Sequence, residues 1–254
     1  MTTIAPPTDG RPAPRRARGR ARISWAVIAV TSLAIAGYFV GQYGQGSLSD
    51  LAGRHVGLAE TYANRPWPIT IAFYAHIVFS GLALAIGPFQ FSTRLRRRYP
   101  AGHRWVGRAY LVSVALGGVA ALVMSFVSSV GLLGFFGFGT LAVLWMWTGW
   151  KGYTAIRAGD VGLHRSWMMR NFALTYAAVM LRTWLGVLLV AQIPFMTGAD
   201  GFQNAFDNAY AVVPFWCWLP NLVVVEWLIR RRGLPSFRLT PGAAPVTGPR
   251  AHQR

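Results

Sequence analysis

Six long apolar runs constrain the fold of this chain more than any other feature of its sequence. Each run approaches or exceeds the roughly 20 apolar residues that a helix needs to cross the hydrocarbon core of a bilayer. An open sheet would leave unpaired backbone groups in lipid, so the runs are predicted to be helices. The sequence therefore predicts an all-α fold, a six-transmembrane-helix bundle with spans at residues 24–43, 68–91, 105–127, 132–153, 172–194 and 210–229.

The charged residues predict how this bundle is oriented. The formal net charge is +18, but only 13% of residues are charged, whereas soluble domains carry about 25%. Apart from Arg54, Arg65 and Arg182, every Lys and Arg lies in one of four alternate segments: 1–23, 92–108, 151–170 and 230–254. The positive-inside rule then places both termini in the cytoplasm. Because the basic residues sit at helix ends and not on one folded face, we expect no nucleic-acid partner.

The two ends of the chain differ in composition from the rest. Residues 1–23 and 233–254 are rich in Pro, Arg and small residues and have no apolar period, so we expect disordered cytoplasmic tails beside anionic inner-leaflet lipids. Between them, residues 24–232 form one membrane domain. The first run imitates a secretory signal, but its apolar stretch continues past the A-x-A site and favours an uncleaved anchor. Arginine in place of nearly all lysine is typical of a GC-rich bacterium, so we expect a bacterial cytoplasmic (inner) membrane.

Two polar residues lie deep in the predicted spans. At ~1.5 Å per residue, His76 is roughly 12 Å and Arg182 roughly 18 Å from the outer end of its helix. An arginine near the bilayer centre costs ~2.5–3.5 kcal/mol on insertion scales, so it is expected to face the protein interior and to have a partner. No Asp or Glu lies at this depth. The remaining partners are His76, helix carbonyls or a bound anion.

A second group of polar residues lies at the predicted cytoplasmic face. AGHRWVGRAYL (101–111) and GLHRSWMMRNFAL (162–174) each place a His-Arg pair, a Trp and another Arg before a long apolar run. The candidate binding residues at this face are His103, His164, Arg104, Arg108, Arg165, Arg170, Gln90, Asn221 and Glu226.

Three interpretations of this group remain open. In the first, the arginines extend to lipid phosphates and Trp105 and Trp167 anchor the helices at the interface. In the second, His103 and His164 are the axial ligands of haem b, and Arg104 and Arg165 hold its propionates. In the third, the group binds a quinol headgroup, an anionic lipid or another small molecule, while a His and Glu226 move protons. A three-ligand metal site that includes Glu226 is a variant of the third.

Four segments resemble a known family in the same order along the chain: HIVFSGLALAIGPFQF, HRWVGRAY, LHRSWMMRNFAL…LR and CWLPNLVVVEW. They are similar to domain-of-unknown-function family 2306, uncharacterised prokaryotic multi-pass membrane proteins, from about Trp67 to Trp227. The family pattern maps onto the polar residues named above and onto Gly107. The resemblance implies a membrane location and supplies no mechanism.

Three functions follow as alternatives. A membrane redox or haem-binding protein would use the cytoplasmic-face residues, with haem b as cofactor. A small-molecule or proton-coupled carrier would use a midplane site at His76 and Arg182. A non-catalytic assembly or scaffold protein would associate with itself as a homodimer or with a respiratory-chain partner. The redox or haem-binding protein is the leading hypothesis from the sequence, and the carrier and the scaffold are its alternatives.

Overall fold

The computed structural model describes residues 15–235, and every element in that range is a helix. Six of these helices are long and apolar enough to cross a membrane, which confirms the predicted all-α fold with six spans. Most of the predicted tail residues, 1–14 and 236–254, lie outside the described range. The elements are α1 (Arg15–Tyr43), α2 (Leu48–Gly53), α3 (Ala59–Ala63), α4 (Trp67–Gln90), α5 (Thr93–Arg98), α6 (Pro100–Ser125), α7 (Gly131–Arg157), α8 (Val161–Thr175), α9 (Ala177–Gln192), the short 3-10 helix η1 (Ile193–Phe195), α10 (Gly201–Trp216) and α11 (Leu219–Arg231).

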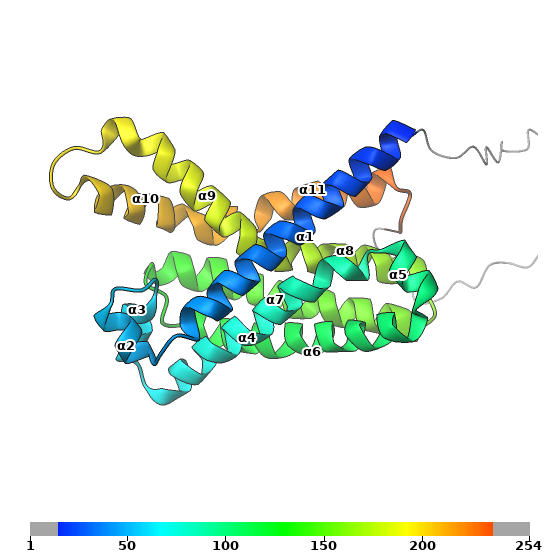
Figure 1. Ribbon diagram of the computed structural model, residues 1–254, viewed down its shortest axis with the longest axis horizontal. Helices are drawn as coiled ribbons and strands as arrows, with labels where there is room; N and C mark the ends of the chain where they lie inside the picture. The colour runs from blue at the N-terminus through cyan, green and yellow to red at the C-terminus, as the bar shows by residue number, and fades with distance from the viewer. Residues whose placement is uncertain (1–14, 236–254) are drawn as a thin grey trace, which may run out of the picture.

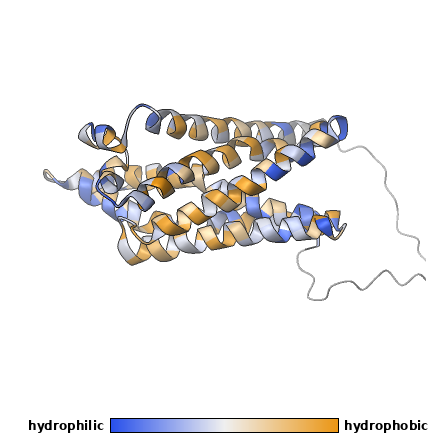
Figure 2. Cartoon of the chain, turned by 90° about the horizontal axis from the view of Figure 1, so that it is seen from below, coloured by the Kyte–Doolittle hydropathy of each residue, from blue (hydrophilic) through white to orange (hydrophobic). Residues whose placement is uncertain are grey.

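The helices form a bundle with one hairpin that turns away from it. Helices α4, α6, α7 and α8 pack in sequence, α1 crosses α4 diagonally, and α11 lies on α8 (Figure 1). The hairpin of α9 and α10 diverges from the bundle at the upper left of the same view. Hydrophobic residues dominate the lengths of the helices and hydrophilic residues gather toward their ends (Figure 2). We call the end that carries α5 and the last turn of α11 the basic end, and the end that carries α2 and α3 the opposite end.

The predicted fifth and sixth spans are not single continuous helices, which corrects the prediction at 172–194 and 210–229. In the fifth, α8 ends at Thr175, and the segment long and apolar enough to cross a membrane, Ala177–Phe195, begins with α9 after Tyr176. The sixth consists of α10 and α11, separated by Cys217 and Trp218. Pro220 lies in the first turn of α11, where its ring and missing N–H prevent α10 from continuing.

Other boundaries differ from the prediction at the ends of the helices. Helix α1 begins at Arg15, so residues 15–23 are helical and do not belong to a disordered tail. Helix α10 begins at Gly201, nine residues before the predicted span. The long loop after α1 folds into the two short helices α2 and α3.

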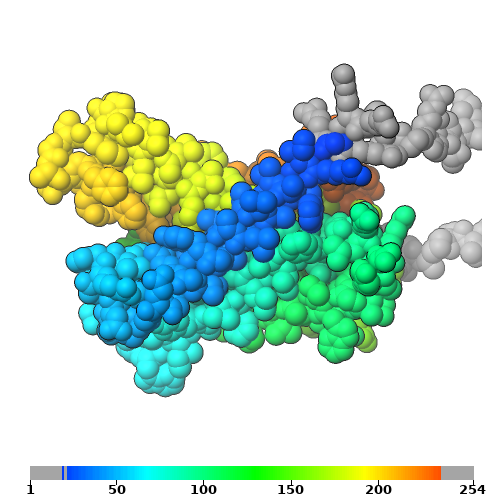
Figure 3. Space-filling view, viewed as in Figure 1, coloured from blue at the N-terminus to red at the C-terminus, as the bar shows by residue number. Residues whose placement is uncertain are grey.

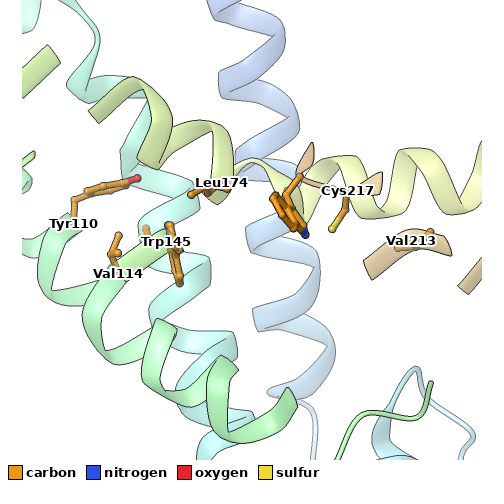
Figure 4. Packing of buried hydrophobic residues seen from close by; sticks show 9 residues of the cluster. Tyr110, Val114, Trp145, Leu174, Val213 and Cys217 are labelled. Atoms are coloured by element: carbon orange, nitrogen blue, oxygen red, sulfur yellow. The ribbon is translucent and has the colours of Figure 1, made fainter. Parts of the chain in front are cut away.

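A buried core joins the bundle to the broken spans. Tyr110, Val114, Trp145 and Leu174 come from α6, α7 and α8, and they share one cluster with Val213 and Cys217 at the second break (Figure 4). Close approach here requires a glycine. A Cβ atom added at Gly137 of α7 would lie 2.4 Å from the Cβ of Pro214 on α10. The small residue therefore sets the position where the hairpin meets the bundle.

A smaller core closes the opposite end. Tyr43 of α1, Tyr62 of α3 and Phe73 of α4 pack together under α2 and α3. The hydroxyl of Tyr43 accepts a hydrogen bond of 2.9 Å from the backbone N–H of Leu58. Burial raises the pKa of Tyr62 to about 12, so this hydroxyl stays neutral. The loop is thus tied to the bundle by aromatic packing and by backbone hydrogen bonding.

Candidate functional site

Arg182 lies in the apolar span of α9, six residues after the first break. Its Nη1 donates a hydrogen bond of 2.8 Å to the carbonyl oxygen of Ala178, and its guanidinium stacks on the ring of Phe39 at 4.0 Å. Within residues 15–235, no carboxylate forms an ion pair with it. Arg182 is therefore a half-buried cation whose charge is not balanced by an acidic side chain of the described protein.

Hydroxyl and imidazole groups surround this cation. Tyr38 and Tyr43 of α1 and Tyr210 of α10 lie within electrostatic range of the Arg182 guanidinium, and so does His76 of α4. These residues come from helices on both sides of the hollow that separates the α9–α10 hairpin from α1 to α3 (Figure 3). Arg182 is thus in electrostatic range of His76 and of three tyrosines, while its direct contacts are with Ala178 and Phe39.

His76 is held by the helix that packs against α4. Its Nδ1 lies 3.1 Å from the carbonyl oxygen of Gly117 on α6 and 3.1 Å from the Ser80 hydroxyl. The carbonyl accepts the Nδ1 proton, which leaves Nε2 as the unprotonated nitrogen of a neutral ring. Gly117 permits this contact, because a Cβ there would lie 2.8 Å from the Ser80 oxygen.

Asn221 lies at the two helix breaks, and not beside the histidines at the basic end. Its Nδ2 donates to the carbonyl of Cys217 at 3.0 Å and to the carbonyl of Ala173 at 3.1 Å. One amide therefore bridges the end of α10 and the last turn of α8. The sequence placed Asn221 at the same end as the two histidines and so suggested that it binds a ligand. In the structure, Asn221 lies where the α9–α10 hairpin joins the bundle.

Arg170 and Glu226 form an ion pair between α8 and α11. Arg170 Nε donates to Glu226 Oε1, and Arg170 Nη2 donates to Glu226 Oε2 at 2.9 Å, so the contact is bidentate. The arginine side chain is 9% exposed and the glutamate 35%. The guanidinium also stacks on Trp167 at 4.6 Å. Glu226 balances the charge of Arg170, and the pair lines a cleft of about 400 Å³ between α7, α8 and α11.

His103 of α6 and His164 of α8 both lie at the basic end. His103 lies within electrostatic range of His164, and both are in range of Arg96. Nδ1 of His164 donates to the carbonyl oxygen of Gly152 at 2.8 Å, which leaves Nε2 for another partner. Burial lowers the pKa of His164 below its ordinary value. Among the described residues no three His, Cys, Asp or Glu side chains group as metal ligands, so Glu226 does not join the histidines.

The remaining predicted residues are spread over the basic end. Gln90 lies beside α6: its Oε1 is 3.4 Å from the position that a Cβ atom at Gly107 would occupy. Arg108 stacks on Trp105 at 4.9 Å, as expected for an interfacial anchor. Arg104 and Arg165 are exposed. The group predicted as one cluster is thus divided into the ion pair, the histidine pair and separate surface arginines.

A buried hydrogen-bond network joins α6, α7 and α8, and most of its members were missed. Tyr110 donates to Oδ1 of Asn171 at 2.7 Å, while Nδ2 of Asn171 donates to the Trp145 carbonyl at 2.6 Å and to Thr148 Oγ1 at 2.9 Å. The Trp145 indole donates to Thr175 Oγ1 at 2.8 Å. Tyr110 and Trp145 gave no signal in the sequence, since aromatic residues are frequent in such spans.

The comparisons with known proteins concern most of this membrane region. A family model described as "Predicted membrane protein (DUF2306)" matches residues 73–229. This range covers α4 to α11 nearly completely, and so all the residues of the ion pair, the histidine pair and the buried network. No curated protein and no solved structure matches the chain.

Proposed function

The chain belongs to domain-of-unknown-function family 2306 of predicted membrane proteins, and we propose that it is a carrier that holds a small anion at Arg182 in the middle of the bilayer. The observation that carries this proposal is the guanidinium of Arg182, which lies in an apolar span and has no ion pair with a carboxylate among residues 15–235. Intramembrane cations are expensive and are kept where they bind a partner. An arriving anion supplies that partner.

The surroundings of Arg182 suit a carboxylate or a phosphate. A guanidinium has five N–H donors, and one of them goes to the Ala178 carbonyl. Its planar edge pairs with two oxygens of one anionic group. The hydroxyls of Tyr38, Tyr43 and Tyr210 lie within electrostatic range and offer further donors. His76, neutral in its hydrogen bond to Gly117, is the group that would accept a proton when the anion is bound.

The broken spans supply a way to move this site. The hairpin of α9 and α10 joins the bundle through Tyr176 and through Cys217 and Trp218, and Asn221 bridges both places. Discontinuous helices near the bilayer midplane are a common feature of transporter binding sites. Rotation of the hairpin about these two breaks would expose Arg182 to one side and then to the other. By the positive-inside rule, we place the basic end in the cytoplasm of a bacterial inner membrane.

The first test measures unfolding of Arg182→Gln in detergent without added anion. Removing the unbalanced charge should stabilise the protein by part of the ~2.5–3.5 kcal/mol insertion cost of an arginine. Loss of the stacking on Phe39 should destabilise it by about 1 kcal/mol. We therefore expect the variant to unfold at a higher temperature than the parent. Arg65→Gln, which removes an exposed arginine at the opposite end, serves as the control. A lower unfolding temperature for Arg182→Gln would show that Arg182 is structural.

The second test measures uptake into proteoliposomes. Acetate, lactate, succinate and inorganic phosphate serve as radiolabelled probes, because they cover one and two negative charges on small groups. We expect uptake of at least one probe, its loss in Arg182→Gln and its partial return in Arg182→Lys. Equal uptake by the parent and Arg182→Gln would contradict the proposal.

Haem binding is a second candidate, and one observation favours it. His164 is oriented by its Nδ1 hydrogen bond to Gly152, as axial histidines commonly are, and His103 lies close by. A reduced-minus-oxidised spectrum of protein from haem-supplied cells tests it, beside the His103→Ala, His164→Ala double variant and a His55→Ala control. A Soret band that survives in the double variant, or no band in the parent, would exclude these ligands.

A further inference from the structure

The cleft between α7, α8 and α11 has a lining that changes in polarity along the helices. On α11, Leu222, Glu226 and Arg230 line it at four-residue intervals, which places them on one face of the helix. A rise of ~1.5 Å per residue separates each from the next by about 6 Å. The lining therefore changes from apolar to charged over about 12 Å toward the basic end.

The other two walls have the same gradient. On α7, Leu144 lies deeper than Thr148, because this helix ends at Arg157 on the basic end. On α8, which begins at the basic end, Leu174 lies deeper than Arg170. Three helices thus present leucines at one depth and polar groups nearer the surface. Such a gradient fits a ligand that has an acyl chain and a polar head.

The charges of the cleft determine whether the polar head group of the ligand is anionic or cationic. The carboxylate of Glu226 balances Arg170 in the bidentate pair, so these two contribute no net charge. Arg230 is exposed at the mouth and leaves the cleft with one positive charge. The mouth therefore attracts an anion.

The surface around the mouth indicates that the ligand arrives through the bilayer. Trp147 lines the cleft, and Val223 and Trp227 follow the lining residues Leu222 and Glu226 on α11; the three are exposed by 43%, 70% and 54%. Apolar side chains exposed to this degree on membrane-spanning helices face lipid. A soluble anion would have to cross this apolar surface, whereas a lipid of the adjacent leaflet already lies against it.

We propose that the α7–α8–α11 cleft binds one anionic phospholipid of the leaflet at the basic end. Its phosphate lies against Arg230, its glycerol esters lie at the level of Thr148 and the Arg170–Glu226 pair, and one acyl chain follows Leu144, Leu174 and Leu222. The proposal is independent of the carrier function, because it uses no residue near Arg182. The lipid fastens α11 to the bundle on the side where α8 and α11 meet.

The test uses the full chain, stripped of lipid in a neutral detergent and titrated with phosphatidylglycerol or with phosphatidylcholine of the same acyl chains. Native mass spectrometry gives the affinity for the first bound lipid. We expect phosphatidylglycerol to bind more tightly than phosphatidylcholine, and Arg230→Gln to weaken its binding by about fivefold, as expected for one interfacial cation. Arg231→Gln is the matched control, because it removes the same charge from the next residue, whose guanidinium stacks on Trp227 at 5.0 Å. It should bind as the parent does.

Several outcomes would overturn the proposal. Equal binding of the two lipids would show that the head charge is not recognised. Equal weakening by Arg230→Gln and Arg231→Gln would indicate general attraction to a basic helix end. If inorganic phosphate competes with the lipid as strongly as phosphatidylglycerol does, the site binds a soluble anion, and if a short-chain quinone displaces the lipid at lower concentration, it binds a quinone. Arg230→Lys, which keeps the charge, should bind normally and excludes misfolding as the cause of a loss.

Discussion

The buried network of Asn171 predicts a measurable loss of stability. Its side chain is fully buried and makes three hydrogen bonds, to Tyr110, to the Trp145 carbonyl and to Thr148. Hydrogen bonds between membrane helices contribute about 0.6 kcal/mol each. Asn171→Leu, which keeps the size of the side chain, should therefore lower the free energy of unfolding by about 2 kcal/mol.

A double-mutant cycle tests the arrangement more sharply than the single variant. Tyr110→Phe removes the bonds to Asn171 and Thr175 and should cost about 1 kcal/mol. Because one bond is shared, the double variant should lose about 0.6 kcal/mol less than the sum of the single losses. The assay is unfolding in mixed micelles with increasing sodium dodecyl sulfate, followed by tryptophan fluorescence.

The control for this cycle is Asn208→Leu on α10. Asn208 is exposed, so its loss should change stability by less than about 0.5 kcal/mol. A strictly additive double variant, or an Asn171→Leu protein as stable as the parent, would refute the reasoning. It would mean that these hydrogen bonds do not fix α8 against α6 and α7.

Three further changes have expected outcomes. Burial lowers the pKa of His164 below 6.5, its value in the unfolded chain. The contribution of His164 to stability is therefore complete above pH 6.5 and is lost as the pH falls below it. Between pH 7 and pH 5, the unfolding temperature of His164→Gln should fall less than that of the parent. Gly137→Ala forces its Cβ against Pro214 and should cost about 1–3 kcal/mol in detergent unfolding, as overpacking does. Tyr43→Phe leaves the Leu58 N–H without its acceptor, costs about 1 kcal/mol and should speed proteolysis between α1 and α4.

The parts of the fold set by the bilayer could be predicted from sequence. In lipid, a helix is the structure that satisfies the backbone hydrogen bonds of a single apolar run, so the six spans could be predicted directly. The two breaks did not follow, because they depend on contacts between helices. Pro220 marks a place where one helix stops, but only the three-dimensional arrangement shows that Asn221 reaches Ala173 on α8 and so couples this break to the one at Tyr176.

The candidate sites show the same division between depth and direction. Sequence gives the depth of a residue, and this placed Arg182 near His76 and away from any acid. Sequence does not give the direction in which a side chain leaves its helix. Residues at the basic end were therefore predicted as one group, although Glu226 pairs with Arg170 while His164 bonds to the Gly152 carbonyl. Aromatic residues of the candidate site, such as Phe39, could not be predicted from the sequence, because an apolar residue in an apolar span carries no distinguishing signal.

The composition of α8 has a consequence for the order in which the chain assembles. This helix is 15 residues long and falls outside the segments that are apolar enough to cross a membrane. It stays among the other helices because α6 and α7 satisfy Asn171 and because α11 neutralises Arg170. Since α11 is synthesised after α8, a nascent chain that contains α8 but not yet α11 carries a buried cation whose counterion has not yet been made. Assembly of the α8 side of the bundle therefore waits for the synthesis of α11, and chains that stop before α11 should be degraded and not accumulate.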